Sequence, residues 1–340
     1  MLPWFENGKF PLYLAPMAGF TDIGFRKLCK EKGADVVVSE FVLADAILRG
    51  DPKVWNSIEF TEDQRPMGVQ IFGSEADIMA DAARMIVDRL NPTFIDLNFG
   101  CPAKKVTCKN AGSSLLRDLP LLGHICESVV KALPDVPVTA KIRIGWDSES
   151  LVAPETGRLL ESVGIQALAI HGRTKAQGYK GDANWDIIHE TADAISIPVI
   201  GNGSIASRYD IHRLRDQFSV SGLMVGRAAI GNPWIFESIK SLLESGEPAT
   251  PPSVEERWEF VIRYAEIMRG HYSHLRTEMI LGIMKGRMIS FVAGFPGARQ
   301  LRNRMSRLTS FEEIEDLRDE SLETLQRLEA DESQVLTIKE

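Results

Sequence analysis

The chain contains 340 residues, of which 44% are hydrophobic and 25% are charged. Such a composition is typical of a folded globular protein and excludes a largely disordered chain. The sequence has no run near the roughly 18 consecutive apolar residues that a membrane helix requires. The length exceeds one ordinary domain, and it fits a barrel of about 250 residues with a smaller appended domain.

The net charge of −8 argues against a protein covered with basic surface for nucleic acid. The charge is uneven, however. Between Arg257 and Arg307 there are ten Lys or Arg residues and three acids, so this segment carries +7 and the remainder −15. The segment is therefore a candidate site for an anionic partner.

The N-terminal sequence MLPWFENGKF lacks the basic and apolar regions of a secretory signal, so we expect a cytoplasmic protein. The four cysteines form no CxxC pair, and a chain of this size needs no disulfide framework. We therefore expect free thiols in a reducing compartment.

Eight short runs rich in apolar and β-branched residues predict β-strands. Each is separated from the next by a segment long enough for a helix, and amphipathic helices are predicted over 75–90, 121–133 and 207–218. The predicted strands are 13–17, 35–40, 67–72, 94–100, 138–144, 167–172, 198–203 and 222–227.

This repeated order predicts an α/β fold, and eight units indicate a (β/α)8 TIM barrel over residues 1–245. A doubly wound sheet would usually have fewer strands and a GxGxxG motif after the first, which is absent here. After the Pro-containing turn 246–253, patterns such as 254–272 predict a C-terminal all-α helical-bundle domain over 253–330, followed by a tail at 331–340.

Polar residues lie within or at the carboxyl ends of the predicted strands, and in a TIM barrel that end is the catalytic face. A single such residue is usually a loop cap. Several converging on one rim favour a ligand site, because desolvated polar groups cost stability unless a ligand uses them. These residues are Glu40, Gln70, Asn98, Lys141, Arg143, His171 and Asn202.

The last two strands end in the motifs Gly201-Asn202-Gly203 and Val225-Gly226-Arg227. In TIM barrels the loops at these positions often bind phosphate, although the glycines alone would also suit tight turns. Lys141 lies among apolar neighbours and needs an anionic partner. These features favour a phosphorylated cofactor.

Cys101 follows Gly100 and precedes Pro102, on a constrained loop directly after the fourth strand. A thiol there can act as a nucleophile or as an acid, since an ordinary pKa near 8.5 keeps its proton on at neutral pH. Cys29, Cys108 and Cys126 are interpreted as structural. Metal-ligand spacing and a Ser-His-Asp order are both absent, so we expect neither a metal nor a triad.

Several motifs, in order over the first 240 residues or so, resemble those of the tRNA-dihydrouridine synthases, especially the bacterial B and C types. The most specific are GCPAKKV, within the longer stretch DLNFGCPAKKV (96–106), and KIRIGW (141–146). The others are LAPMAGFTD (14–22), SEF (39–41), GVQIFG (68–73), AGSSLL (111–116), HGRT (171–174), PVIGNGSI (198–205) and VGRAAIGNPWIF (225–236).

The resemblance implies an FMN-dependent oxidoreductase that reduces the C5=C6 bond of D-loop uridines in tRNA, with NADPH as the electron source. Hydride from reduced FMN would add to C6, and Cys101 would protonate C5. Glu40, Asn98, Arg143 and Arg173 would contact or orient the uridine. The implied FMN-binding residues are Pro16, Met17, Ala18, Gln70, Lys141, His171, Asn202, Gly203, Ser204, Gly226 and Arg227.

The target uridine must leave its stacked environment, so the enzyme needs a grip on the rest of the tRNA. The basic segment is the candidate, with Lys285, Arg287, Arg299, Arg302 and Arg304 as the expected tRNA contacts. Many family members carry Lys-His where this chain has Lys285-Gly286. We expect tRNA as the partner, no membrane or metal partner, and a monomer.

Two other functions remain open at this stage. An FMN barrel acting on a free pyrimidine, as dihydroorotate-type dehydrogenases do, would need no basic helical domain. A tRNA-binding protein without catalysis would not need Cys101 and Lys141.

Overall fold

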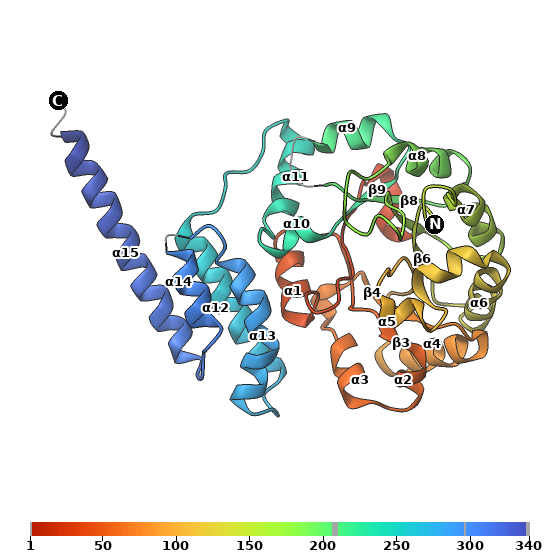
Figure 1. The fold of residues 1–340 in the computed structure, drawn as a ribbon, viewed down its shortest axis with the longest axis horizontal. Coiled ribbons are helices and arrows are strands. Elements are labelled where there is room, and N and C mark those ends of the chain that lie inside the picture. Colours follow the sequence, from red (N-terminus) through yellow and green to blue (C-terminus); the bar gives the residue numbers. More distant parts are fainter. Residues whose placement is uncertain (1, 206–209, 296, 338–340) are drawn as a thin grey trace. The chain divides into compact units, whose positions relative to one another are not determined.

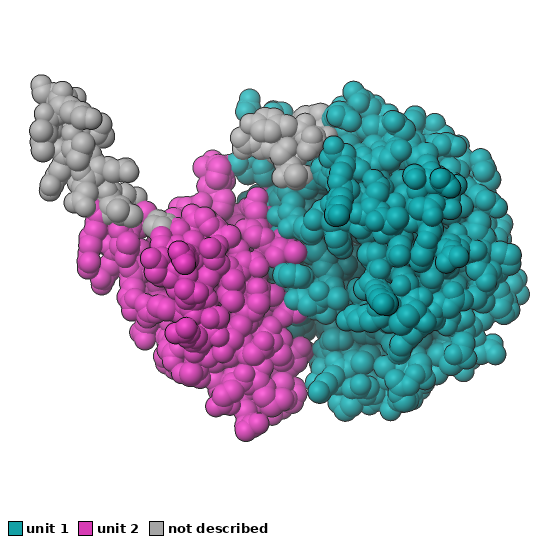
Figure 2. All heavy atoms as spheres, in the orientation of Figure 1, with its two compact units in different colours: residues 1–229, 235–249 teal, residues 230–234, 250–340 magenta. Residues whose placement is uncertain are grey.

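The computed structural model describes residues 2–205, 210–295 and 297–337. The chain divides into two compact units, which Figure 2 colours separately. The first comprises residues 1–229 and 235–249, and the second comprises residues 230–234 and 250–340. The segment 230–234 therefore belongs to the helical unit, although it lies within the range predicted for the barrel.

The first unit contains a closed ring of eight parallel strands surrounded by helices (Figure 1). Pairing of β2 with β4 closes the ring, and the two-residue strand β3 extends beside the end of β4. The predicted TIM barrel is confirmed. The strands are β1 Leu12–Leu14, β2 Val36–Val38, β3 Val42–Leu43, β4 Met67–Phe72, β5 Phe94–Phe99, β6 Val138–Arg143, β7 Leu168–His171, β8 Val199–Asn202 and β9 Gly222–Val225.

The helices of this unit follow the strands as the amphipathic patterns predicted, and the expected helix 207–218 starts outside the described residues. The α-helices are α1 Ile23–Glu31, α2 Ala44–Leu48, α3 Pro52–Ile58, α4 Ala76–Leu90, α5 Lys104–Thr107, α6 Leu119–Ala132, α7 Ala153–Ser162, α8 Trp185–Asp193, α9 Asp210–Gln217, α10 Arg227–Ile230 and α11 Ile235–Ser245. The 3-10 helices are η1 Pro3–Gly8, η2 Glu62–Gln64 and η3 Gly112–Arg117.

An aromatic cluster fills the amino end of the barrel. Helix η1 places Trp4 and Phe5 against Tyr13 of β1 and Phe94 at the start of β5. The indole N–H of Trp4 donates to the Tyr13 hydroxyl at 2.5 Å, so the buried polar atoms of both rings are paired. Because this end is packed, a ligand enters from the opposite, carboxyl end.

The second unit consists of helices α12 Val254–His271, α13 Thr277–Phe291, α14 Ala298–Met305 and α15 Glu312–Thr337. Helix α12 begins with a capping box formed by Ser253 and Glu256. The edges of Phe260 and Tyr264 meet the Phe291 ring, with centroid distances of 5.1 and 5.3 Å. Among the described helices of both units, none is long and apolar enough to span a membrane.

We expect Gly68→Ala to destabilise the barrel by about 1–3 kcal/mol, because a Cβ at this β4 position would overlap the Phe94 ring. Phe94→Leu alone should also destabilise, by leaving space around Trp4. Chemical denaturation of the two single variants and the double variant tests the contact. The free energy of unfolding should fall less in the double variant than the sum of its decreases in the two single variants. Strictly additive decreases would contradict the packing of Phe94 against Gly68.

Candidate active site

The register of the strands places the predicted polar residues side by side at the carboxyl end of the barrel. Asn98 pairs with Lys141, Arg143 with His171, and His171 with Asn202. The carboxyl ends of barrel strands meet at one face, so residues distant in sequence form a common site there.

The loop that carries Cys101 is fastened at both ends. The Asn98 side-chain oxygen accepts the backbone N–H groups of Gly100 and Cys101 at 3.1 and 2.9 Å. The Cys101 carbonyl accepts from both the backbone N–H and the hydroxyl of Ser113. Two independent anchors therefore fix the backbone at the thiol.

The Cys101 thiol is half-buried, whereas Cys108 is exposed and Cys29 and Cys126 are buried. Burial raises the Cys101 pKa, and this outweighs a hydrogen bond from the Ala103 backbone and the nearby cations. The thiol thus keeps its proton at neutral pH. This state suits an acid better than a nucleophile.

Arg143 joins two rim loops. Its guanidinium donates to the carbonyl of Gly100 and to those of Thr174 and Gly178, each at 2.9 Å, and its side chain is 2% exposed. The first carbonyl lies in the Cys101 loop, and the others lie in the loop between β7 and α8. Arg143 therefore holds the loops after β5 and β7 together at the side of the site.

Lys141 of β6 and Asn202 of β8 meet over the strand between them, β7. The Lys141 ammonium donates to the Asn202 side-chain oxygen at 3.2 Å, while the Asn202 amide N–H donates to the Met224 carbonyl. Burial, together with the nearby Arg143, lowers the pKa of Lys141 to about 8. An incoming anion would stabilise the charged form of this lysine.

His171 lies among cations. Burial lowers its pKa to about 2, with further lowering by Lys141, Arg143, Arg173 and Arg227, so the ring is neutral at physiological pH. Its Nε2 lies 3.3 Å from an Arg173 guanidinium nitrogen, which can only donate. Nε2 is therefore the acceptor, and the proton of the neutral ring is on Nδ1.

The turn after β8 lies beside this group of cations. Gly203 has a φ of 120°, and a Cβ there would come within 2.9 Å of the His171 ring, so only glycine fits. The Ser204 hydroxyl accepts from Arg173 at 2.9 Å and from the Ala183 N–H at 3.0 Å. Arg173 also donates to the Gly181 carbonyl and fastens the loop after β7.

The predicted residues Pro16, Met17 and Ala18 follow β1, where Pro16 and Met17 are half-buried and Ala18 is exposed. Glu40, which follows β2, accepts the backbone N–H of Gly19 at 2.8 Å. This bond holds the loop after β1 next to the carboxyl end of β2. Gly226 lies after β9, where a Cβ would make only ordinary contacts, so sterics do not require glycine there.

Gln70 is fully buried, which the sequence did not predict. Its amide N–H donates to Asp96, and its amide oxygen accepts from the Asn98 amide. Gln70 thus lies inside the barrel wall as a link between two residues of β5. Asp96 was not among the predicted site residues, although its position two residues before Asn98 on the same strand was a usable signal.

Tyr179 was also missed. Its ring is 56% exposed, with the Arg227 guanidinium carbon 4.3 Å and that of Arg143 5.5 Å from the ring centroid. It belongs to a long loop without strand or helix periodicity, between Gly178 and Gly181, both at positive φ. An exposed aromatic ring beside two arginines suits stacking against a planar ligand.

The predicted tRNA contacts of the helical unit differ in their exposure. Arg299 and Arg302 are exposed, and Lys285 is half-buried. Arg304 is ion-paired with Glu320. Arg287 is 7% exposed and donates to the Ile283 carbonyl at 2.5 Å, so its surroundings differ from those expected of a phosphate ligand.

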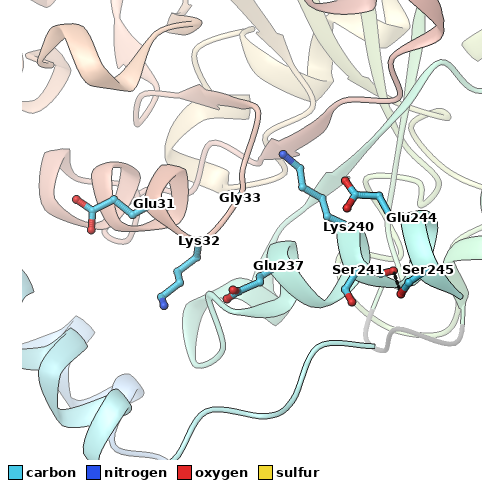
Figure 3. A pocket seen from close by; sticks show the side chains of 8 residues that line it. All are labelled: Glu31, Lys32, Gly33, Glu237, Lys240, Ser241, Glu244 and Ser245. Atoms are coloured by element: carbon cyan, nitrogen blue, oxygen red, sulfur yellow. Dashed lines mark hydrogen bonds between the residues drawn. The ribbon is translucent and has the colours of Figure 1, made fainter. Parts of the chain in front are cut away.

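A surface pocket lies between the C-terminal end of α1 and helix α11 (Figure 3). Its lining mixes both charges, and Lys240 is paired with Asp35 at 2.6 Å. Asp35 directly precedes β2 and accepts the backbone N–H of Leu12 at the start of β1, so the pocket lies near the amino ends of these strands and away from the predicted site. No group of His, Cys, Asp or Glu suited to a metal ion occurs among the residues described.

The sequence profile of the family described as "Dihydrouridine synthase (Dus)" matches residues 13–329. The chain belongs to the dihydrouridine synthase family. It is similar to tRNA-dihydrouridine synthase B of Pseudomonas aeruginosa, with 42% identity over 87% of this chain and 88% of that protein. It is also 36% identical to a probable tRNA-dihydrouridine synthase of Rickettsia bellii, over 87% of this chain and 89% of the relative.

A solved structure of TcOYE with pHBA has a TM-score of 0.51 and 11% identity, covering 72% of this chain and 91% of the other. At that identity the likeness concerns the barrel fold alone. Membership of the dihydrouridine synthase family confirms the predicted FMN-dependent oxidoreductase. The site fits such a cofactor, because the guanidinium groups of Arg173, bonded to Ser204, and of Arg227, over the Tyr179 ring, supply positive charge at the rim that carries the Gly203 turn.

We expect FMN to bind less tightly as the pH rises from 7 to 9.5. Lys141 is charged below its pKa of about 8 and neutral above it, and the charged form attracts an anionic ligand. The loss should approach tenfold per pH unit at the upper end, if one proton is coupled to binding.

Quenching of flavin fluorescence during titration of the apoprotein measures this effect. Lys141→Met should give weaker binding with a flatter pH profile, whereas Lys109→Met, which replaces an exposed lysine, should follow the wild type. An unchanged profile in Lys141→Met would contradict the role of this charge.

Proposed function

We propose that this protein reduces the C5=C6 bond of D-loop uridines in tRNA, with Cys101 as the proton donor to C5 and NADPH as the electron source. Bound FMN would supply the hydride that adds to C6. The observation that carries the proposal is a thiol held protonated on a doubly anchored loop, next to a cationic site on a dihydrouridine synthase barrel.

The acid role of Cys101 follows from charge. When hydride adds to C6, negative charge develops toward C5 and the C4 carbonyl oxygen of uracil. A neutral thiol at C5 can quench it by giving up its proton, and the neighbouring Arg143 and Lys141 would stabilise the thiolate that remains. Solvent then reprotonates the sulfur.

The cofactor site would be built from several parts of the rim. Arg227, Ser204 and the Gly203 turn suit the phosphate, and Lys141 and His171 suit the polar edge of the flavin ring. Pro16, Met17 and Ala18 would line the ring, while Asn202, Gly226 and Gln70 would support the residues in contact with it.

The uridine would lie against the wall formed by the fastened loops. Hydrogen bonds to backbone groups of these loops come from Glu40, Asn98, Arg143 and Arg173, and Arg143 bonds to two of the loops. We propose that they orient the uridine by setting the shape of this wall as well as by direct contact. Tyr179 offers a ring for stacking on the extruded base.

The tRNA itself would be gripped by the helical unit. Arg299 and Arg302 project from the exposed side of α14, where phosphates can reach them. The other three predicted contacts would mainly stabilise the fold of the helical unit instead of binding phosphate directly. They are Lys285, Arg287 and Arg304. In this proposal the protein acts as a monomer in the cytoplasm.

We expect Cys101→Ala to retain FMN and to lose dihydrouridine formation by at least about 100-fold, the usual contribution of an acid catalyst. The measurement is mass-spectrometric analysis of nucleosides from dihydrouridine-free tRNA incubated with protein, FMN and NADPH. Cys108→Ala is the matched control and should behave as the wild type, since that thiol is exposed.

Dihydrouridine formation by Cys101→Ala at the wild-type rate would contradict the acid role. A wild-type protein that binds flavin and reduces free pyrimidines but never tRNA would instead indicate a dihydroorotate-type activity.

The double substitution Arg299→Glu and Arg302→Glu should weaken tRNA binding by tenfold or more, without loss of FMN. It should also reduce the dependence of log Kd on log salt concentration by roughly 1–2, because fewer counterions are released from phosphates. The charge-matched control is Lys53→Glu with Lys131→Glu, two exposed lysines of the barrel unit. Equal losses in both double variants would show a general charge effect and reject a specific grip.

A further inference from the structure

Three neighbouring strands of the barrel carry buried polar side chains that are partners in the strand register. Gln70 of β4 pairs in register with Asp96 of β5, and Asp96 pairs with Thr139 of β6. The Asp96 side chain is 4% exposed. One carboxylate oxygen accepts from the Thr139 hydroxyl and the other from the Gln70 amide N–H, both at 2.6 Å.

From Asp96 the hydrogen bonds continue toward the carboxyl end of the barrel, and each side chain accepts from the next one. The Gln70 amide oxygen accepts from the Asn98 amide N–H at 2.7 Å. The Asn98 oxygen in turn accepts the backbone N–H groups of Gly100 and Cys101. The relay thus runs from Asp96 through two amide side chains to the loop of the reacting thiol.

The direction of the relay depends on the carboxylate. An ionised carboxylate only accepts, so the Gln70 amide must present its N–H groups to Asp96 and its oxygen to Asn98. Asn98 must then present its N–H groups to Gln70 and its oxygen to the loop. If both amides turned around, Asn98 would present N–H groups to backbone N–H groups, and the loop would lose its anchor.

We propose that Asp96 is a positioning residue, which orients Gln70 and Asn98 and thereby fixes the loop that presents the Cys101 thiol to the substrate. This inference deepens the proposed function and rests on it. Burial raises the pKa of Asp96, whereas the hydrogen bonds from Thr139 and Gln70 and the nearby charge of Lys141 act in the opposite direction and stabilise the ionised form. That arrangement sets the direction of the donors at the expense of burying a charge.

The first test is Asp96→Asn, which keeps the size but removes the strict acceptor. An asparagine can offer either its oxygen or its N–H groups to Gln70, since the Thr139 hydroxyl accepts or donates in turn. We expect kcat for tRNA reduction to fall tenfold or more while FMN binding changes little. Loosening of the loop should also make Cys101 react faster with iodoacetamide, by threefold or more, with a lower apparent thiol pKa.

The alkylation is read at the Cys101 peptide by mass spectrometry, in a Cys108→Ser background that removes the exposed thiol. Asp35→Asn is the matched control. Like Asp96, Asp35 accepts one hydrogen bond at each carboxylate oxygen, but its donors are the Leu12 backbone N–H at 2.9 Å and the Lys240 ammonium at 2.6 Å, at the amino end of the barrel. It should lower thermal stability without changing Cys101 reactivity.

The decisive variant is the double substitution Asp96→Asn with Gln70→Glu. It moves the carboxylate one step along the relay, where it would accept from the amide introduced at position 96 on one side and from Asn98 on the other. Asn98 would again be forced to present its oxygen to the loop. Compared with Asp96→Asn alone, we expect the double variant to alkylate more slowly at Cys101 and to recover most of the lost kcat.

The proposal is overturned if Asp96→Asn alkylates and turns over like the wild type. It is equally overturned if the double variant shows the same Cys101 alkylation rate and the same kcat as Asp96→Asn, or if neither variant folds. The alkylation readout needs no turnover. Hence a wild type that makes no dihydrouridine, but whose Cys101 responds to these substitutions as expected, would reject the proposed function and leave the positioning role intact.

Discussion

The central interaction in this structure is the acceptance of two backbone N–H groups by one side-chain oxygen of Asn98. Directly after a barrel strand the chain must leave the sheet, and its amide groups lose their strand partners. Here that need is met by a side chain of the strand itself, which sets the course of the Cys101 loop. The protonation state of the thiol then follows from the half-buried position into which the loop puts it.

The same solution recurs around the rim. Glu40 holds the loop after β1, Arg143 holds the loops after β5 and β7, and Arg173 holds the loop after β7 to the turn after β8. These side chains bond mostly to backbone groups of loops and keep the loops in place. The resulting mouth has an excess of cations, which the phosphate of the flavin would balance in the binding mode that we propose.

Much of the barrel could be predicted from the sequence, because buried parallel strands leave a clear pattern of apolar runs ending in polar residues. The eight strands of the ring match the predicted ranges to within a few residues. The two-residue strand β3 and helix η1 were not predicted, since pairing with β4 and packing against Tyr13 define them rather than local periodicity.

At the site, residues at strand ends were predictable and their partners were not. The position of Lys141 in an apolar strand showed that it needs an anion, but not that the Asn202 side-chain oxygen accepts a hydrogen bond from it. Tyr179 lies in a loop whose fold is set by distant arginines, so no local pattern marks it. The burial of Arg287 depends on helix packing, which charge counting along the chain does not reveal.

The most direct test of proton donation by Cys101 is the pH dependence of a single turnover. Protein loaded with reduced flavin is mixed with dihydrouridine-free tRNA without oxygen, and flavin reoxidation is followed by absorbance from pH 7 to 10. We expect a rate that is level at neutral pH and falls at alkaline pH, with a midpoint matching the thiol pKa found by alkylation of the same protein. A rate that instead rises as the thiolate forms would show a nucleophile and contradict the acid role of Cys101.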